Sequence, residues 1–297
     1  MTSRARALVT NPWGKPRYLP LVTALYVLWS IIPVAIAIQF SFNSGRSRST
    51  WQGFSTRWYV GNPADAASVL YDPSLRFALN QSLTLAFLTM LVATPIGVAL
   101  AIGLARWRGR LSKPSNLLML IPLVTPEIVM GVALFLVFDN LYDFVPFGTW
   151  AQFLGHVTFS ISFVVIIVRG RLFAIGRDYE EAAMDLGASP WEAMRRVLLP
   201  LLTPALIASF AIVFALSIDD FVISQFLVGG ADSVTIPVRL YSGARLAPPP
   251  SLNALATVLM AITIGVVAIG GIAFKFLGKR LGTGDDSALE TVGRFEI

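Results

Sequence analysis

Residues 179–200, YEEAAMDLGASPWEAMRRVLLP, form a charged, helix-prone segment between two apolar stretches of the chain. Asp178 is placed to cap a helix, and two adjacent glutamates follow in its first turn, where acidic side chains are favourable. Gly187 permits a left-handed residue that ends this helix. Ser189 and Pro190 are a second start signal, a capping residue followed by proline at the first helical position. The segment therefore predicts two short helices that meet at a sharp bend.

The chain around this segment is unusually apolar. Of its 297 residues, 55% are hydrophobic and only 13% are charged, and the mean hydropathy is +0.69. A typical soluble domain has about 25% charged residues, so we expect lipid to be the solvent of this chain. Because the chain has no cysteine, disulfides, thiolate metal sites and a cysteine nucleophile are excluded.

Six apolar runs are long enough to cross a bilayer, which takes roughly 20 residues of helix. The runs are Leu19–Phe42, Phe77–Leu104, Leu117–Phe138, Phe153–Val168, Leu201–Leu216 (with a continuation to Val228 as an alternative) and Ala254–Leu277. Prolines within them are compatible with membrane helices, where neighbouring groups satisfy the freed backbone. The sequence thus predicts an all-α polytopic membrane protein. We expect a six-helix transmembrane domain over 19–280, preceded by segment 1–18 and followed by tail 281–297.

The basic residues predict the orientation, since cytoplasmic loops are enriched in Lys and Arg. If the N-terminus is cytoplasmic, the inside segments hold 17 of the 23 Lys and Arg residues and the outside loops hold 6. We therefore expect both termini, and the loop 169–200, in the cytoplasm. The net charge of +6 is then a topology signal, and nucleic-acid binding is not expected.

From its residues alone, the segment 179–200 has two interpretations. Its small Ala182–Ala183 face would let a partner protein approach closely. The alternative is an inert connector or a helix that lies on lipid headgroups. The acidic pair argues against lipid contact, because the inner leaflet is itself anionic.

The segment resembles the EAA motif of ABC importer permeases: Glu-Ala-Ala, three residues, Gly, nine residues, an aliphatic residue, any residue, then Leu-Pro. The spacing is intact in this chain. The resemblance implies the six-helix type I importer permease fold. It also implies a cytoplasmic coupling helix, seated in a cleft of separate ATPase subunits that form a dimer. The residues that it assigns to ATPase coupling are Glu181, Ala182, Ala183, Asp185, Gly187, Leu199 and Pro200.

We expect no catalytic activity from the chain itself. Its only Gly-Lys pairs, at 14–15 and 278–279, are in the wrong setting for a Walker A motif. No cluster of metal ligands and no set of nucleophile, base and orienting group is visible, which argues against a membrane enzyme. ATP hydrolysis is therefore expected in a partner subunit, and no cofactor is expected here.

Acidic residues within the apolar runs are candidates for a translocation pathway, because an ionisable group costs about 2.5–3.5 kcal/mol to insert. We expect Glu127 near the midplane of a continuous third span. One interpretation is a carboxylate that faces a path for a cationic solute. The alternative is a glutamate that is protonated or paired within the bundle. Asp219 and Asp220 follow the fifth span and cannot face one direction on a helix. One is expected to face the pore while the other caps or pairs; a solvated helix end is the alternative. We expect His156 to be a satisfied bundle residue.

The outer loop DNLYDFVPFGTW adds Asp139, Asp143 and Tyr142, and it contains no Lys or Arg. Carboxylates and aromatic faces can together bind an ammonium group. Solvated acids beside an ordinary aromatic belt are the alternative. Because all the charged pathway candidates are acidic, a small cationic substrate is the best electrostatic interpretation.

Five segments in order resemble the spermidine/putrescine permeases: SLTLAFLTMLVATPIGVALAIGLAR, IPLVTPEIVMGVALFLVF, ALSIDDFVISQFLVGG, IPVRLYS and LNALATVLM. This resemblance implies polyamine import across a bacterial plasma (inner) membrane. The implied partners are a second related permease, two ATPase copies and an extracytoplasmic binding protein. The first outer loop, 44–71, departs from the pattern in its length and its Trp and Arg content.

Two alternatives remain at the level of sequence. One is an importer of the same architecture for a sugar, an opine-like compound or ferric ion. The other is an autonomous channel or secondary transporter with Glu127 as a proton relay, although no internal repeat is evident.

Overall fold

The computed structural model describes residues 18–47, 49–61, 68–107, 109–142, 144–245 and 250–280, and these form helices joined by loops. The long helices are α2 (Tyr18–Ser41), α3 (Pro73–Arg106), α7 (Thr149–Ile175), α10 (Leu199–Asp219) and α13 (Pro250–Arg280). The short elements are α4 (Ser112–Leu118), α5 (Ile121–Val124), α6 (Glu127–Asn140), α8 (Asp178–Asp185), α9 (Pro190–Ala193), η1 (Met194–Leu198), α11 (Val222–Phe226), η2 (Ala231–Ser233) and α12 (Ile236–Arg245). Within the described ranges no strand forms, and one isolated β-bridge joins Asn43 to Phe54. The predicted all-α class is confirmed.

Among the described residues, five helices are long and apolar enough to cross a membrane. A sixth span results if Ser112–Val124 and Glu127–Asn140 are counted together, but they are bent by 106°. The prediction of a continuous third helix over Leu117–Phe138 is therefore wrong. Thr125 and Pro126 have extended backbones, with ψ of 128° and 135°. Proline disfavours a helical residue before it and lacks the N–H of a helical hydrogen bond, so the helix breaks there.

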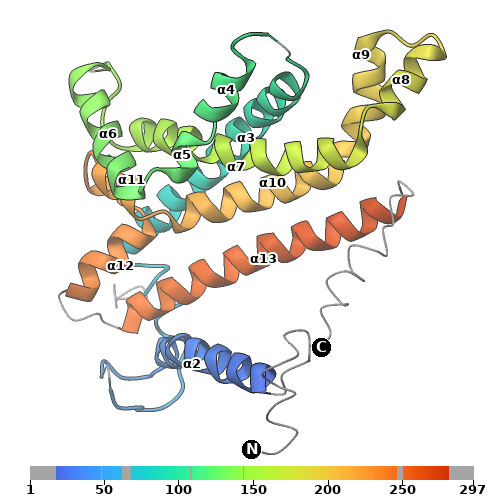
Figure 1. The fold of residues 1–297 in the computed structure, drawn as a ribbon. Helices are drawn as coiled ribbons and strands as arrows, with labels where there is room; N and C mark the ends of the chain where they lie inside the picture. Colours follow the sequence, from blue (N-terminus) through green and yellow to red (C-terminus); the bar gives the residue numbers. More distant parts are fainter. Residues whose placement is uncertain are drawn as a thin grey trace, which may run out of the picture.

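The centre of the bundle is the pair α3 and α7, with α10 packed against both and α13 against α10 (Figure 1). Small residues let the first two helices approach closely, as is common in membranes. A Cβ atom on Gly97 of α3 would lie only 2.6 Å from Cβ of Val164 on α7. Ala93 and Ala101, one turn on either side of Gly97, are fully buried. This close contact makes α3 and α7 the frame on which the other elements are placed.

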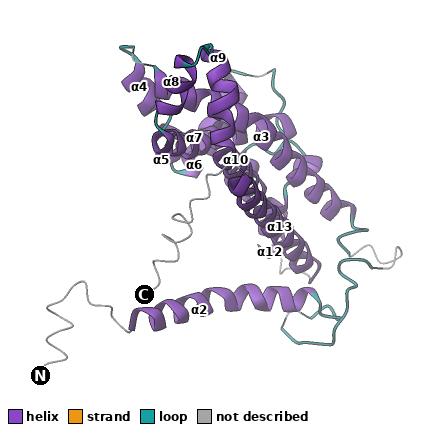
Figure 2. Ribbon diagram, turned by 90° about the vertical axis from the view of Figure 1, so that its right-hand side faces the viewer, coloured by secondary structure: helices purple, strands orange, loops and turns teal. Residues whose placement is uncertain are grey.

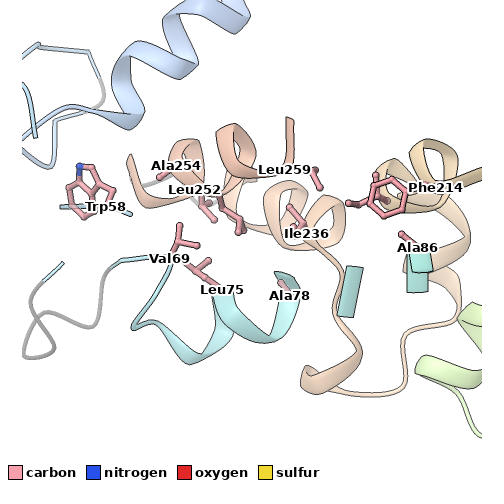
Figure 3. Packing of buried hydrophobic residues seen from close by; sticks show 12 residues of the cluster. Trp58, Val69, Leu75, Ala78, Ala86, Phe214, Ile236, Leu252, Ala254 and Leu259 are labelled. Atoms are coloured by element: carbon pink, nitrogen blue, oxygen red, sulfur yellow. The ribbon is translucent and has the colours of Figure 1, made fainter. Parts of the chain in front are cut away.

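The first outer loop is folded onto the ends of these helices. Trp58 and Val69 from the loop pack with Leu75 of α3 and Leu252 of α13 (Figure 3). Asn43 organises the loop backbone: its Nδ2 donates to the carbonyls of Ser47 and Thr50, each at 3.0 Å, and its Oδ1 accepts from the Gln52 N–H at 2.8 Å. In the loop that departs from the family pattern, the described residues are thus held by these contacts.

Helix α2 stands apart from the rest. It packs chiefly on α13, and its most apolar window has none of its residues buried. Figure 2 shows it diverging from the bundle. Its exposed face includes Leu25, Tyr26 and Trp29. An apolar helix in this position needs lipid or another protein around it.

The two ends of the bundle differ. In Figure 1, α8 and α9 project at the right, on the side where α13 ends, whereas α11 and α12 lie at the left. The charged segment is therefore separated by the length of the spans from the break that follows α10.

Candidate functional site

The segment 178–200 forms the predicted helix–bend–helix. Helix α8 ends in a Schellman motif: the N–H of Ala188 donates to Ala183 O at 3.0 Å, and that of Gly187 donates to Met184 O at 2.9 Å. Gly187 has φ of +91°, a left-handed conformation that favours glycine. The bend at Gly187 is confirmed. The expectation that Asp178 caps the helix is wrong, because Asp178 is already helical and the cap position before it makes no side-chain hydrogen bond.

The second helix begins as predicted. Ser189 Oγ accepts from the N–H of Glu192 at 3.3 Å, and Glu192 Oε2 accepts from the N–H of Ser189 at 3.1 Å, which is a capping box. Helix α9 then runs through the π-helical turn η1 into α10, as one element over Pro190–Asp219. The turn ends just before Pro200, which has no N–H for the usual helical bond. The second helix of the segment is therefore continuous with the fifth span.

Most of the residues assigned to ATPase coupling are accessible. Glu181, Ala182, Asp185 and Gly187 are exposed, whereas Ala183, Leu199 and Pro200 are partly buried. Leu186 is 90% exposed beside them. The segment therefore presents both acidic and apolar side chains at its surface.

The bend is also tied to α3, through a contact that the sequence analysis missed. Glu180 of α8 forms an ion pair with Arg106, the last residue of α3. Beside this pair is a cavity of about 150 Å³, lined by Ala105, Arg106, Leu172, Phe173, Gly176, Arg177 and Glu180. The two partners are 74 positions apart and neither belongs to the motif, so no sequence pattern signalled the pair.

Glu127 lies directly after the break in the third span. It is the first residue of α6 and is exposed, rather than midway along a continuous helix as expected. A carboxylate in this position is stabilised by the positive end of the helix dipole. Within the described part of the chain, no hydrogen bond or ion pair reaches it.

Asp219 and Asp220 have opposite surroundings. Asp220 Oδ2 accepts from the N–H of Ser224 at 2.8 Å and lies 3.2 Å from His156 Nε2. Asp219 is exposed, and no hydrogen bond from the described residues reaches it. The expectation that one of the two caps or pairs is confirmed: Asp220 caps α11 and lies against His156. That the other faces a pore stays a prediction. Since α10 ends at Asp219, the alternative of a fifth span reaching Val228 is wrong.

His156 is a satisfied bundle residue, as predicted. It is 2% exposed, with Nδ1 2.7 Å from Ser217 Oγ and Nε2 3.1 Å from Ser224 Oγ. Its partnership with Asp220 was not predicted, because 64 positions separate the two. No sequence pattern signalled this pair.

The outer loop candidates are only partly placed. Asp139 is exposed near the end of α6, and Tyr142 is 48% exposed with its ring 5.6 Å from that of Phe144. Asp143 lies outside the described residues. No hydrogen bond or ion pair joins Asp139 to Glu127 or Asp219, although α11, which follows the two aspartates, packs against α6. Among the residues described, no three His, Asp or Glu side chains gather as metal ligands.

Comparison with known proteins gives one family. The model of the binding-protein-dependent transport system inner membrane component matches residues 93–283. The spermidine/putrescine transport system permease protein PotC of Escherichia coli is 36% identical over 246 residues, covering 83% of this chain and 89% of its own length. The putrescine transport system permease protein PotI of Escherichia coli is 34% identical over 278 residues, covering 92% and 93%.

A solved structure shares the fold. A chain of a bacterial ABC transporter that imports the acidic polysaccharide alginate superposes with a TM-score of 0.69 at 16% identity, covering 87% of this chain and 96% of its own length. At this identity the likeness shows the fold alone.

Proposed function

Because this chain belongs to the family of binding-protein-dependent transport system inner membrane components, and is a permease subunit of an ABC importer, we propose that its substrates are the polyamines spermidine and putrescine. The observation that carries the substrate proposal is the pair of exposed carboxylates, Glu127 at the break in the third span and Asp219 at the end of the fifth. Neither has a cationic partner within the described chain. Such unpaired acids attract an ammonium group, whereas an anion pathway would need the opposite charge.

The geometry of the segment 178–200 supports a way to couple ATP hydrolysis to movement of the spans. An ATPase dimer would receive the exposed face from Glu181 to Gly187 in its cleft. When the cleft closes, the rigid bend displaces α9 and, through η1, the fifth span. The chain itself would remain non-catalytic, and the ATPase subunits would hydrolyse ATP. Residues 169–200 are then the coupling loop of a transmembrane domain over 19–280.

Further partners would cover the remaining surfaces. A second, related permease would pack on the apolar face of α2 and complete the pathway at α6. An extracytoplasmic binding protein would deliver substrate at the end where α11 and α12 lie. In this arrangement both termini face the cytoplasm of a bacterium, and Asp139, Tyr142 and Asp143 lie near the outer entrance.

Uptake by the reconstituted importer tests this proposal. The two permeases, the ATPase and the binding protein would be placed in proteoliposomes with ATP, and entry of labelled spermidine and putrescine would be measured. We expect ATP-dependent uptake that unlabelled polyamine suppresses and that a sugar, an opine or ferric ion does not. Uptake without ATP would indicate an autonomous transporter. Transport of only a non-polyamine solute would leave the permease assignment in place and would show that polyamines are not the substrates.

A further inference from the structure

We propose that the buried His156–Asp220 pair is a positioning device for the pathway. It holds the break between α10 and α11 in one geometry, and this geometry turns Asp219 toward the aqueous path. The inference rests on the proposed function, in which Asp219 meets the cationic substrate. Asp220 then acts through its neighbour and does not bind substrate itself.

The pair joins three helices at one point. His156 is on α7, Ser217 on the last turn of α10 and Ser224 on α11. With its hydrogen on Nε2, the imidazole donates to Asp220 and accepts the Ser217 hydroxyl hydrogen at Nδ1. Both ring nitrogens therefore have partners, although the residue is almost completely removed from solvent. A satisfied polar network in a low-dielectric interior fixes one arrangement more strictly than apolar packing does.

The direction of Asp219 follows from this contact. Asp220 has an extended backbone, with φ of −64° and ψ of 124°, so the chain turns immediately after Asp219. The turn is held because the Asp220 carboxylate accepts from the N–H groups of Ile223 at 3.4 Å and Ser224 at 2.8 Å, in the first turn of α11. One carboxylate faces inward to His156, and the adjacent one is thereby turned outward.

Helix α11 has little room to move independently of its neighbours. A Cβ atom on Gly155 of α7, beside His156, would lie 2.8 Å from Ile223 Cγ2. On α6, a Cβ atom on Gly131 would lie 2.6 Å from the ring of Phe226. Since α11 is packed this closely between α7 and α6, the pair that anchors α11 also constrains α6, whose first residue is Glu127.

A second buried contact supports the same anchor one turn away. Gln152 of α7 donates through Nε2 to Ser224 O at 2.9 Å and to Ser233 O at 3.0 Å. Its Oε1 accepts from Gln81 Nε2 of α3 at 2.8 Å. The chain of contacts ties the α10–α11 break to the α3–α7 frame. An anchor on the rigid frame is what a positioning role requires.

Cysteine labelling tests the proposal, because the chain has no cysteine of its own. Asp219→Cys would be introduced into the complete importer and its reaction rate with a water-soluble, cationic methanethiosulfonate measured. The rate would be compared in three backgrounds: the native pair, His156→Leu and His156→Gln. Gln retains a side-chain N–H donor near the position of Nε2, whereas Leu has none. Phe54→Cys is the control for correct folding, because the native Phe54 lies on the outer loop and is 72% exposed.

We expect Asp219→Cys to react with the native pair, and His156→Leu to slow this reaction by about tenfold, the effect of losing one hydrogen bond to a charged group. His156→Gln should restore most of the rate, and Phe54→Cys should react equally in all three backgrounds. An Asp219→Cys rate unaffected by His156→Leu would overturn the proposal, as would an absence of reaction with the native pair. The assay needs no transport, so a failed polyamine assignment would not be mistaken for a failed positioning role.

Discussion

At the scale of single residues, Gly187 shows how the bend depends on a residue without a side chain. Its φ of +91° is unfavourable for any residue with a Cβ atom, although no neighbouring atom lies within 4 Å of the Cβ position. The constraint is therefore one of backbone conformation and not of space.

We predict that Gly187→Ala weakens ATPase binding. The left-handed conformation costs an alanine about 1–2 kcal/mol, a factor of roughly 5–30 in an equilibrium constant. Co-purification of the ATPase and ATP-dependent uptake should both fall while the protein stays in the membrane. Gly265→Ala is the matched control, since it lies in α13 with equally open space and no left-handed backbone. Equal behaviour of the two variants would contradict the role given to the bend.

The two aspartates show what the sequence alone leaves open at this scale. Their adjacency was sufficient to predict that they face different ways. Which of them turns inward depends on His156 of α7. No sequence pattern links a histidine so far from the two aspartates to either of them. The bend at Gly187 and the helix start at Ser189 were more predictable, because Schellman and capping-box signals are local.

At the scale of elements, the ion pair between Glu180 and Arg106 joins the bend to a helix that runs the length of the bundle. Helix α3 is the main partner of α7, so the ion pair links α8 to the α3–α7 frame.

We predict that charge reversal at either position lowers ATP-dependent uptake, because two like charges would then face each other. The exchanged pair, Arg106→Glu with Glu180→Arg, should recover uptake relative to both single variants. ATP hydrolysis measured in parallel would show whether the loss is in coupling or in ATPase binding. If the exchanged pair were no better than the single variants, the contact would have no role in transmission.

The third span shows why element boundaries in a membrane chain are hard to predict. Its apolar run is long enough to cross, and proline is tolerated in membrane helices, so a straight helix was expected. Two prolines, Pro122 and Pro126, lie within five residues of each other, and the second coincides with the 106° bend. Composition identified the span, but proline occurs in both straight and broken membrane helices, so the sequence alone did not indicate the bend.

At the scale of the whole molecule, the counts of Lys and Arg predict both termini inside. The arrangement in Figure 1 places the end of α13 on the side of α8 and α9. Six crossings with one broken span are compatible with that arrangement.

Single cysteines test the orientation. We predict that Phe54→Cys reacts with a membrane-impermeant maleimide in intact spheroplasts, and that Leu111→Cys reacts only after permeabilisation. Both native side chains are well exposed, at 72% and 63%, so access to the reagent should depend on the side of the membrane. Reaction of Leu111→Cys in intact spheroplasts would reverse the proposed topology.

The central claim is that a carboxylate at a broken span meets a cationic polyamine, and Glu127→Gln tests it most directly. The measurement is the concentration dependence of labelled spermidine uptake by the complete importer. Asp232→Asn, an exposed outer carboxylate outside the proposed pathway, is the control. The account predicts that Glu127→Gln raises the apparent KM by about tenfold or more, since a charge-assisted contact is lost, while Asp232→Asn leaves it unchanged. Spermidine uptake by Glu127→Gln with the KM and maximal rate of the native importer would contradict it.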